Sequence, residues 1–247
     1  RGITARSHTE AIREVRAAKL RYPLIAKPLD GSLAKGVTWN ICSEKELRAA
    51  TQHALIAYGK RKNISIIVEE MFVGNEYRVL VFGGKVISCV QKIPAGVTGD
   101  GKSPIKNLIK TFNKTRLKGF EIRLDATAKE SLKKAGLTLD SILEQGRFFK
   151  FRNNLNMSDG GRAIDTTRDM HPSLKKAAVA AIEAVGLTYG GLDFLAEDIS
   201  SEKAPYVILE INPHPFYNMN EKPLVEGKGV DVSLLLLESI FPALKKS

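Results

Sequence analysis

The sequence has few of the residues that mark secreted, membrane-spanning or zinc-binding proteins. Only two of its 247 residues are cysteines, Cys42 and Cys89, and they lack metal-ligand or redox spacing. No apolar run approaches the roughly 20 residues of a membrane span, and the chain has no basic-then-apolar secretory start. We therefore expect a soluble, cytoplasmic protein with no membrane partner, in which both cysteines are small buried hydrophobic side chains.

Acidic residues are scarce relative to basic ones. The chain has 27 Asp and Glu against 38 Lys and Arg, a formal net charge of +11. Such an excess is compatible with nucleic-acid binding, a polyanionic substrate or a solvated basic surface. Neither a basic stripe interleaved with aromatics nor zinc-finger spacing is present, which argues against a nucleic-acid partner. An anionic small-molecule substrate accounts for the sign of the charge.

Hydrophobic periodicity predicts an α+β chain in two parts. The predicted helices span residues 9–20, 43–58, 105–110, 129–135, 173–185 and 232–240. The predicted strands span residues 24–27, 37–42, 64–69, 76–82, 85–93, 148–152, 192–197 and 206–211. The pattern changes near Gly74, where hairpin strands begin. We expect a small subdomain over residues 1–73, a larger one over 74–247, and a ligand cleft between them.

Three oxygen-bearing side chains on two neighbouring predicted strands suggest a metal site. Asp193 lies on one strand, and Glu210 and Asn212 lie two apart on the next, so the latter two share a face. Hard oxygen ligands suit Mg²⁺, and acids inside apolar runs are costly to bury without a cation or partner. The alternative is that they are polar residues at the edge of a hairpin.

Lys27 ends a predicted buried strand immediately before a glycine-bearing loop, residues 30–37, which includes Gly31, Ser32 and Gly36. A lysine placed there can contact a phosphate, and the backbone amides of the loop can turn toward the same anion. The Gly-Lys-Ser/Thr of a P-loop is absent. A simple hairpin with a surface lysine is the alternative.

Residues 68–78 form an extended segment between the two parts. Its acids, Glu69, Glu70 and Glu76, are of the kind that accepts hydrogen bonds from an adenine amino group and from ribose hydroxyls. Without further context the segment reads as a charged linker.

These motifs together resemble the ATP-grasp ligases, over essentially the whole chain. The resemblance rests on Lys27-Pro28-Leu29-Asp30-Gly31, Glu69 through Glu76-Tyr77-Arg78, Asp193 and Glu210-Ile211-Asn212, in the family's order and approximate spacing. The segments Ile93–Lys102, Phe151–Asp165 and His171-Pro172 are similar to cyanophycin synthetase and to the ATP-grasp half of bifunctional glutathione synthetase. The implied fold has two α+β subdomains gripping ATP between them, with a preceding N-terminal domain outside this chain.

The resemblance implies a role for each matching residue. Lys27 would bind the α- and β-phosphates of ATP under the 30–37 lid loop, Glu69 the adenine amino group, the Phe72 backbone the ring, and Glu76 the ribose. Asp193, Glu210 and Asn212 would hold two Mg²⁺ ions, with Mn²⁺ as a substitute. The transferred phosphoryl group would lie near Arg78 and Arg152, covered by Asn154, Asn156 and residues 158–161.

The implied reaction is ATP-dependent joining of a carboxylate to an amine through an acyl phosphate, on an amino-acid or γ-glutamyl peptide substrate. It needs no protein nucleophile, in keeping with the absence of a Ser/His/Asp or Cys/His constellation. The alternatives are a regulatory or non-catalytic ATP-binding domain of a larger protein and, in another class, a basic nucleic-acid-binding protein. The sequence leaves homo-oligomerisation undecided.

The sequence also departs from the family pattern. Lys92 stands where many relatives have arginine, and an earlier ATP-contacting lysine precedes Arg1. The turn after Asn212 is Pro213-His214-Pro215 instead of a glycine-containing one. His214 is a candidate for substrate contact or for a purely structural turn.

Overall fold

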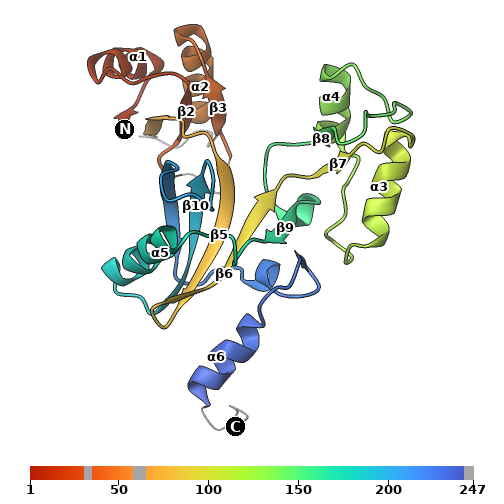
Figure 1. The fold of residues 1–247 in the computed structure, drawn as a ribbon. Coiled ribbons are helices and arrows are strands. Elements are labelled where there is room, and N and C mark those ends of the chain that lie inside the picture. Colours follow the sequence, from red (N-terminus) through yellow and green to blue (C-terminus); the bar gives the residue numbers. More distant parts are fainter. Residues whose placement is uncertain (31–34, 58–64, 242–247) are drawn as a thin grey trace. The chain divides into compact units, whose positions relative to one another are not determined.

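The computed structural model describes residues 1–30, 35–57 and 65–241 (Figure 1). The chain forms two compact units, Arg1–Phe72 and Val73–Ser247, called here the N-terminal unit and the C-terminal unit. No helix in the described ranges is long and apolar enough to cross a membrane.

The N-terminal unit is a four-stranded antiparallel sheet with two helices. Its strands run in the spatial order β1-β4-β2-β3. Their bounds are β1 Gly2–Ala5, β2 Leu24–Pro28, β3 Thr38–Ile41 and β4 Ile66–Glu70, and the helices are α1 His8–Ala17 and α2 Glu44–Ile56. A serine caps the N-terminus of each helix: the Ser7 hydroxyl accepts from the Glu10 N–H, and the Ser43 hydroxyl accepts from the Glu46 N–H.

Strand alternation in this unit orients Lys27. Leu24, Ala26 and Pro28 are buried, and the first two belong to the apolar core shared with α1 and α2. Ile25 and Lys27 alternate with them and remain partly exposed. Because successive side chains point to opposite faces, Lys27 lies on the face of the sheet opposite that core.

The C-terminal unit is built on a six-stranded sheet in the order β11-β10-β5-β6-β9-β12. Its strands are β5 Asn75–Phe82, β6 Lys85–Ile93, β9 Arg162–Asp165, β10 Tyr189–Ala196, β11 Tyr206–Asn212 and β12 Val225–Glu226. All neighbours are antiparallel except β9 and β12. The expected hairpin at Gly83-Gly84 is present, with Phe82 opposite Lys85.

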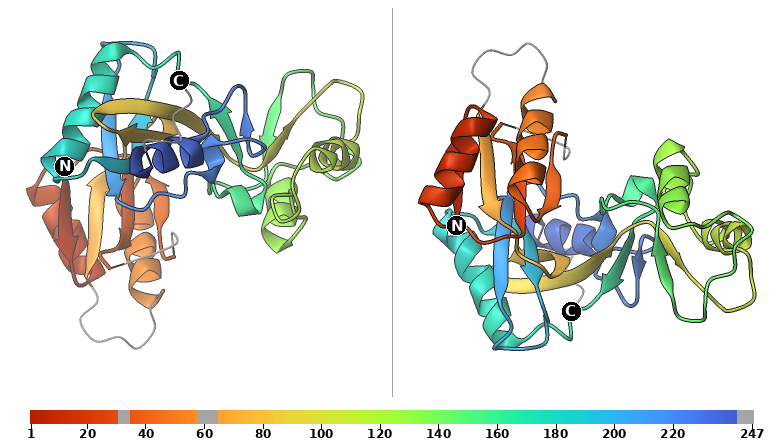
Figure 2. Two further views of the ribbon diagram at one scale, coloured as in Figure 1. Left: turned by 90° about the horizontal axis from the view of Figure 1, so that it is seen from below. Right: turned by 90° about the horizontal axis from the view of Figure 1, so that it is seen from above.

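Helix α5, Pro172–Ala184, covers one face of this sheet (Figure 2). Leu174, Ala178 and Ile182 pack against alternate residues of β5 and β10, among them Val79 and Phe194. The intervening residues of those strands point to the other face, where the charged side chains of the candidate site lie.

A smaller module projects from the sheet between β6 and β9. It pairs β7, Gly96–Thr98, with β8, Phe148–Lys150, and carries α3, Ile105–Lys114, and α4, Ala126–Lys134. Ile105, Leu132 and Phe151 belong to its own apolar core. Figures 1 and 2 show α3 and α4 at the end of the unit away from α5.

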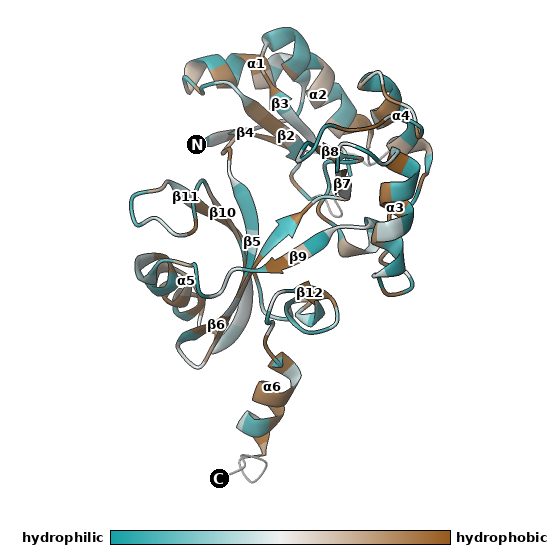
Figure 3. Ribbon diagram, turned by 45° about the vertical axis from the view of Figure 1, so that its right-hand side comes forward, coloured by the Kyte–Doolittle hydropathy of each residue, from teal (hydrophilic) through white to brown (hydrophobic). Residues whose placement is uncertain are grey.

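The last described helix, α6 (Val232–Ile240), contributes only Val232 as a buried residue. Leu234, Leu237 and Ile240 are exposed, and the helix is mostly apolar in Figure 3. Two single-turn 3-10 helices, Met157–Asp159 and Asn218–Asn220, complete the fold.

Several local expectations need correction. Cys89 is buried as expected, and burial raises the pKa of its thiol to about 12, but Cys42 is exposed because it lies in the turn between β3 and α2. His171, rather than Ser173, begins α5: its ring nitrogen accepts from the Ser173 N–H, and Pro172 occupies the first turn.

Replacing Phe194 by alanine should lower the free energy of unfolding by about 3–5 kcal/mol, because the ring is fully buried and leaves a cavity. The ring also stacks on Tyr206, with centroids 5.0 Å apart. Denaturant unfolding followed by circular dichroism measures the loss. Phe216→Ala, at an exposed ring, is the control, and an equally small effect of both changes would contradict this account of the core.

Candidate functional site

A row of charged side chains crosses the face of the C-terminal sheet opposite α5. Glu210 on β11 is directly opposite Asp193 on β10, and Asp193 is directly opposite Arg78 on β5. The Arg78 Nε donates to Asp193 Oδ1 at 2.8 Å, and both side chains are about nine-tenths buried. The sheet register therefore brings two of the predicted site residues, Arg78 and Asp193, into a buried ion pair.

Lys92 on β6 adds a second cation. Its ammonium pairs with the Glu76 carboxylate, directly opposite on β5, and lies 3.8 Å from Asp193 Oδ1. Its side chain is 12% exposed, so it has little contact with solvent. The sequence analysis notes Lys92 only because many relatives have arginine at this position. Its contact with both predicted groups of acids, Asp193 and Glu76, makes it a member of the site.

Glu210 and Asn212 share a face, as strand alternation predicts, and the Asn212 amide donates to Glu210 Oε1 at 2.8 Å. The pairing of β10 with β11 shifts by one residue after Asp193, so that Phe194 is opposite Ile208 and Leu209 forms a bulge. Leu209 is exposed. Next along the chain, His214 is exposed and Pro215 is buried against Gly191, directly across from Asn212.

Asp193, Glu210 and Asn212 together could bind a divalent cation whose remaining ligands come from outside the protein. Arg78 and Lys92 both contact Oδ1 of Asp193, which leaves Oδ2 for a metal. Asn212 contacts one oxygen of Glu210, which likewise leaves the other. Among the described residues, no three His, Cys, Asp or Glu side chains gather to hold a metal by themselves. Two carboxylates and an amide suit Mg²⁺, which takes its remaining ligands from water and phosphate.

In the N-terminal unit, two residues predicted to bind the nucleotide form an ion pair with each other. Lys27 Nζ lies 2.6 Å from Glu69 Oε2, and each side chain is about one-third exposed. Glu70 accepts from the Arg21 N–H at 2.9 Å, and this hydrogen bond, with the nearby Arg21 and Arg1 charges, lowers its pKa. Phe72 is half-buried at the end of this unit.

Only part of the predicted lid loop can be placed. Gly31 and Ser32 lie outside the described residues. Gly36 has a φ of +75°, and a Cβ there would come within 2.5 Å of the Ala57 side chain. Glycine is therefore required at position 36 both by backbone conformation and by its close approach to the end of α2.

The remaining predicted residues cluster around Asp159, at the base of the small module. Arg152 donates to both carboxylate oxygens of Asp125 at 3.0 Å and lies 3.6 Å from Asp159. The Asn154 amide donates to Asp159 Oδ2 at 3.1 Å. The Ala128 N–H and then Arg152 hold the pKa of Asp125 below its ordinary value. The carbonyl of Asn156 accepts from the Gly161 N–H and so closes the loop.

Two arginines that the sequence analysis did not predict as site residues stabilise the end of this loop. Arg116 donates to the Gly161 carbonyl at 2.8 Å, and Arg162 makes two hydrogen bonds with the Glu226 carboxylate. Glu226 also lies 3.8 Å from Arg116. The Arg162 hydrogen bonds lower the pKa of Glu226. Nothing in the spacing of these residues signals the contact, because β12 joins β9 only in the folded chain.

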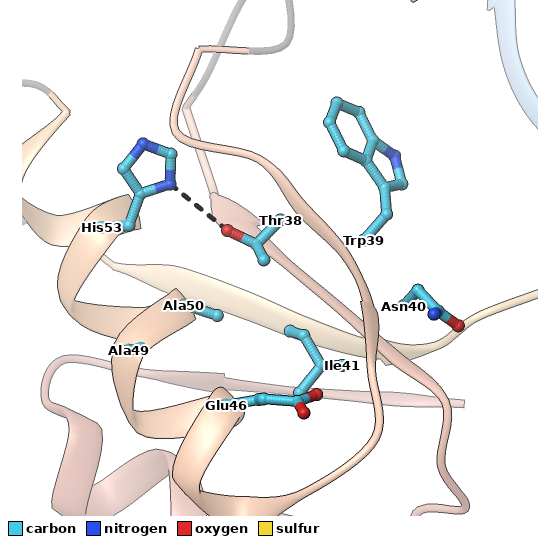
Figure 4. A pocket seen from close by; sticks show the side chains of 8 residues that line it. All are labelled: Thr38, Trp39, Asn40, Ile41, Glu46, Ala49, Ala50 and His53. Atoms are coloured by element: carbon cyan, nitrogen blue, oxygen red, sulfur yellow. Dashed lines mark hydrogen bonds between the residues drawn. The ribbon is translucent and has the colours of Figure 1, made fainter. Parts of the chain in front are cut away.

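A separate hollow of about 420 Å³ lies in the N-terminal unit between β3 and α2 (Figure 4). Trp39 and His53 line it, and the His53 ring is 3.3 Å from the Thr38 hydroxyl. It contains none of the predicted site residues.

Asp193→Asn should lower the free energy of unfolding by about 3 kcal/mol, because it leaves the buried Arg78 and Lys92 charges without their shared carboxylate. Thermal and denaturant unfolding measure this. Asp140→Asn removes an exposed partner of Lys106 and should cost less than about 1 kcal/mol. Equal stabilities of the two variants would show that the Arg78–Asp193 pair does not hold the sheet.

Comparisons with known proteins place this geometry in a family context. No family model matches the chain. Cyanophycin synthetase of Trichormus variabilis is 35% identical over 230 residues, which is 90% of this chain and 25% of that protein. The chain thus spans about a quarter of the length of the curated relatives that it matches.

Solved structures agree. A bifunctional glutathione synthetase from Pasteurella multocida superposes with a TM-score of 0.71 and 26% identity, covering 99% of this chain and 34% of that one. The ATP-grasp ligase PsnB, complexed with minimal precursor, Mg and ADP, shares the fold at a TM-score of 0.50 and 16% identity, over 98% of this chain and 52% of that one. The expected α+β ATP-grasp fold is confirmed, and the chain is homologous to part of cyanophycin synthetase and of bifunctional glutathione synthetase.

Proposed function

We propose that the chain is the ATP-dependent part of a ligase that joins a carboxylate to an amine through an acyl phosphate. The substrate would be an amino acid or a γ-glutamyl or other peptide. The proposal is carried by one observation: on one sheet face two acids, Glu210 and Asp193, lie next to two cations, Arg78 and Lys92, opposite the face that packs against α5. The homology to two ligases that make amide bonds supports it.

Asp193, Glu210 and Asn212 are the residues that would hold Mg²⁺, one ion or two, with Mn²⁺ able to replace it. Bound there, the metal would neutralise phosphate charge and polarise the γ-phosphoryl group. Arg78 would orient Asp193 and leave its second oxygen for the metal, since the guanidinium contacts only one of the two carboxylate oxygens. Lys92 would orient Glu76 through its ion pair and add positive charge near the phosphates.

Nucleotide binding would exchange partners in the N-terminal unit. Lys27 and Glu69 neutralise one another in the structure. In the proposed complex Lys27 would contact the α- and β-phosphates, while Glu69 would accept from the adenine amino group and Glu76 from the ribose. The 30–37 loop, with Gly31, Ser32 and Gly36, would cover the phosphates, and the Phe72 backbone would meet the ring.

The reaction then needs positioning and charge rather than a protein nucleophile. A substrate carboxylate oxygen attacks the γ-phosphorus, and ADP leaves. The amine nitrogen next attacks the acyl carbon, phosphate leaves, and the amine loses a proton. Arg78 and Arg152 would stabilise the charge that develops in both steps, and Asn154 and Asn156, through the 154–161 loop, would exclude water.

Incubation of the chain with ATP, Mg²⁺ and pooled amino acids or γ-glutamyl peptides should release phosphate only when both a carboxylate and an amine substrate are present. A coupled phosphate assay and mass spectrometry of the product measure this. Tight Mg²⁺-dependent ATP binding with no substrate-stimulated release would instead identify a regulatory nucleotide-binding domain.

Glu210→Gln should reduce phosphate release by about 100-fold or more, because it removes a charged metal ligand from an exposed position that the fold does not need. The same variant should bind Mn²⁺ more weakly in the presence of a non-hydrolysable ATP analogue, as measured by electron paramagnetic resonance. Glu202→Gln, an equal change of charge in the same hairpin, should leave both readouts unaltered. Wild-type activity in Glu210→Gln would remove Glu210 from the metal site.

A further inference from the structure

The small module carries an open basic groove. It lies apart from the row of charged residues Glu210, Asp193, Arg78 and Lys92, called here the metal row, and from the residues proposed to bind the nucleotide. The groove has a volume of about 600 Å³ and runs between α4 and β8. One wall is a single face of α4, from Thr127 through Ser131 to Ala135, and the other is Arg147–Lys150 with Arg152 and Asn153. Figure 1 shows α4 beside the β7–β8 pair.

Within the described residues, the backbone groups on the outer edge of β8 have no hydrogen-bond partner. β7 and β8 form a two-stranded sheet, and within the described parts of the chain no further strand adds to it. The Gly99 N–H donates to the Arg147 carbonyl, and the Phe151 N–H donates to the Ala95 carbonyl. Because alternate residues of an antiparallel strand direct their backbone groups to opposite sides, those of Phe148 and Lys150 point away from β7. Such an edge can accept another extended chain.

The positive charge of the groove favours an acidic peptide over a neutral or basic one. Arg147 and Lys150 are exposed, and among the described residues neither is in an ion pair. Lys134 on the opposite wall pairs with Glu130, and Arg152 at the end pairs with Asp125 and Asp159. Four cations against one acid line the groove, and the two that have no partner flank the free edge.

We propose that this groove binds an acidic peptide in extended conformation, as an added strand along β8, with its carboxylates on Arg147 and Lys150. This proposal deepens the proposed function and rests on it in one respect: the peptide would be the carboxylate substrate, held so that it ends near Arg152. Backbone pairing with Phe148 and Lys150 supplies affinity for any extended chain, and the cations supply the preference for an acidic one.

A fluorescein-labelled peptide of alternating aspartate and valine tests the groove without ATP. Fluorescence anisotropy should show binding that weakens when asparagine replaces aspartate, and weakens again when alternate backbone amides are N-methylated. The double variant R147E/K150E should lose about tenfold or more in affinity, because it faces the peptide with like charge. The control K110E/K118E makes the same change of net charge on exposed lysines outside the groove and should stay within about twofold of wild type.

Equal affinity of R147E/K150E and K110E/K118E for the aspartate peptide would overturn the proposal. So would equal binding of the aspartate and asparagine peptides. A labelled oligothymidylate that binds more tightly than the peptide and is lost in R147E/K150E would assign the groove to nucleic acid instead.

A second measurement separates this proposal from the ligase assignment. In the phosphate-release assay R147E/K150E should raise the KM for the acidic peptide and leave kcat unchanged. Specific peptide binding without stimulated phosphate release would support the groove and contradict the ligase function. Phosphate release with other substrates but no peptide binding would support the function and contradict the groove.

Discussion

The ion pair between Arg78 and Asp193 is the interaction on which the C-terminal unit depends. Both side chains are about nine-tenths buried within the sheet, and among the described residues Lys92 is the one other charged group that pairs with Asp193. A slip of β5 against β10 by one residue would carry these charges into the apolar core under α5. The pair therefore fixes the strand register, and the register places every other charged side chain of the row.

The sequence predicts the elements that carry strong local signals. Alternation and the Gly83-Gly84 turn predict the β5–β6 hairpin, and the two-residue spacing of Glu210 and Asn212 predicts their common face. The partner of Asp193 could not be predicted, because Arg78 lies 115 residues away and meets it only through strand pairing. The short strands β1, β7, β9 and β12 were missed for a similar reason: each has two to four residues and forms because a partner strand is present.

The degree to which cations are paired with carboxylates differs between regions of the C-terminal unit. In the metal row and in the Arg116–Arg162–Glu226 group, cations and carboxylates neutralise each other at close range. In the α4–β8 groove Lys134 and Arg152 are paired in the same way, but Arg147 and Lys150 face solvent and are in no ion pair among the described residues. Two of the cations behind the net charge of +11 thus face solvent close together in this groove, although the sequence alone shows the excess only as scattered lysines and arginines.

The bulge at Leu209 has a consequence for how this hairpin can evolve. It absorbs one residue between the outer part of the β10–β11 ladder and the part that holds Asp193 and Glu210. Residues 197–205, which join the two strands, lie on the outer side of it. Insertions and deletions in that connection can be accommodated by the bulge without rotating the two carboxylates. The hairpin is thus free to vary in length at its tip while the site at its base stays constant.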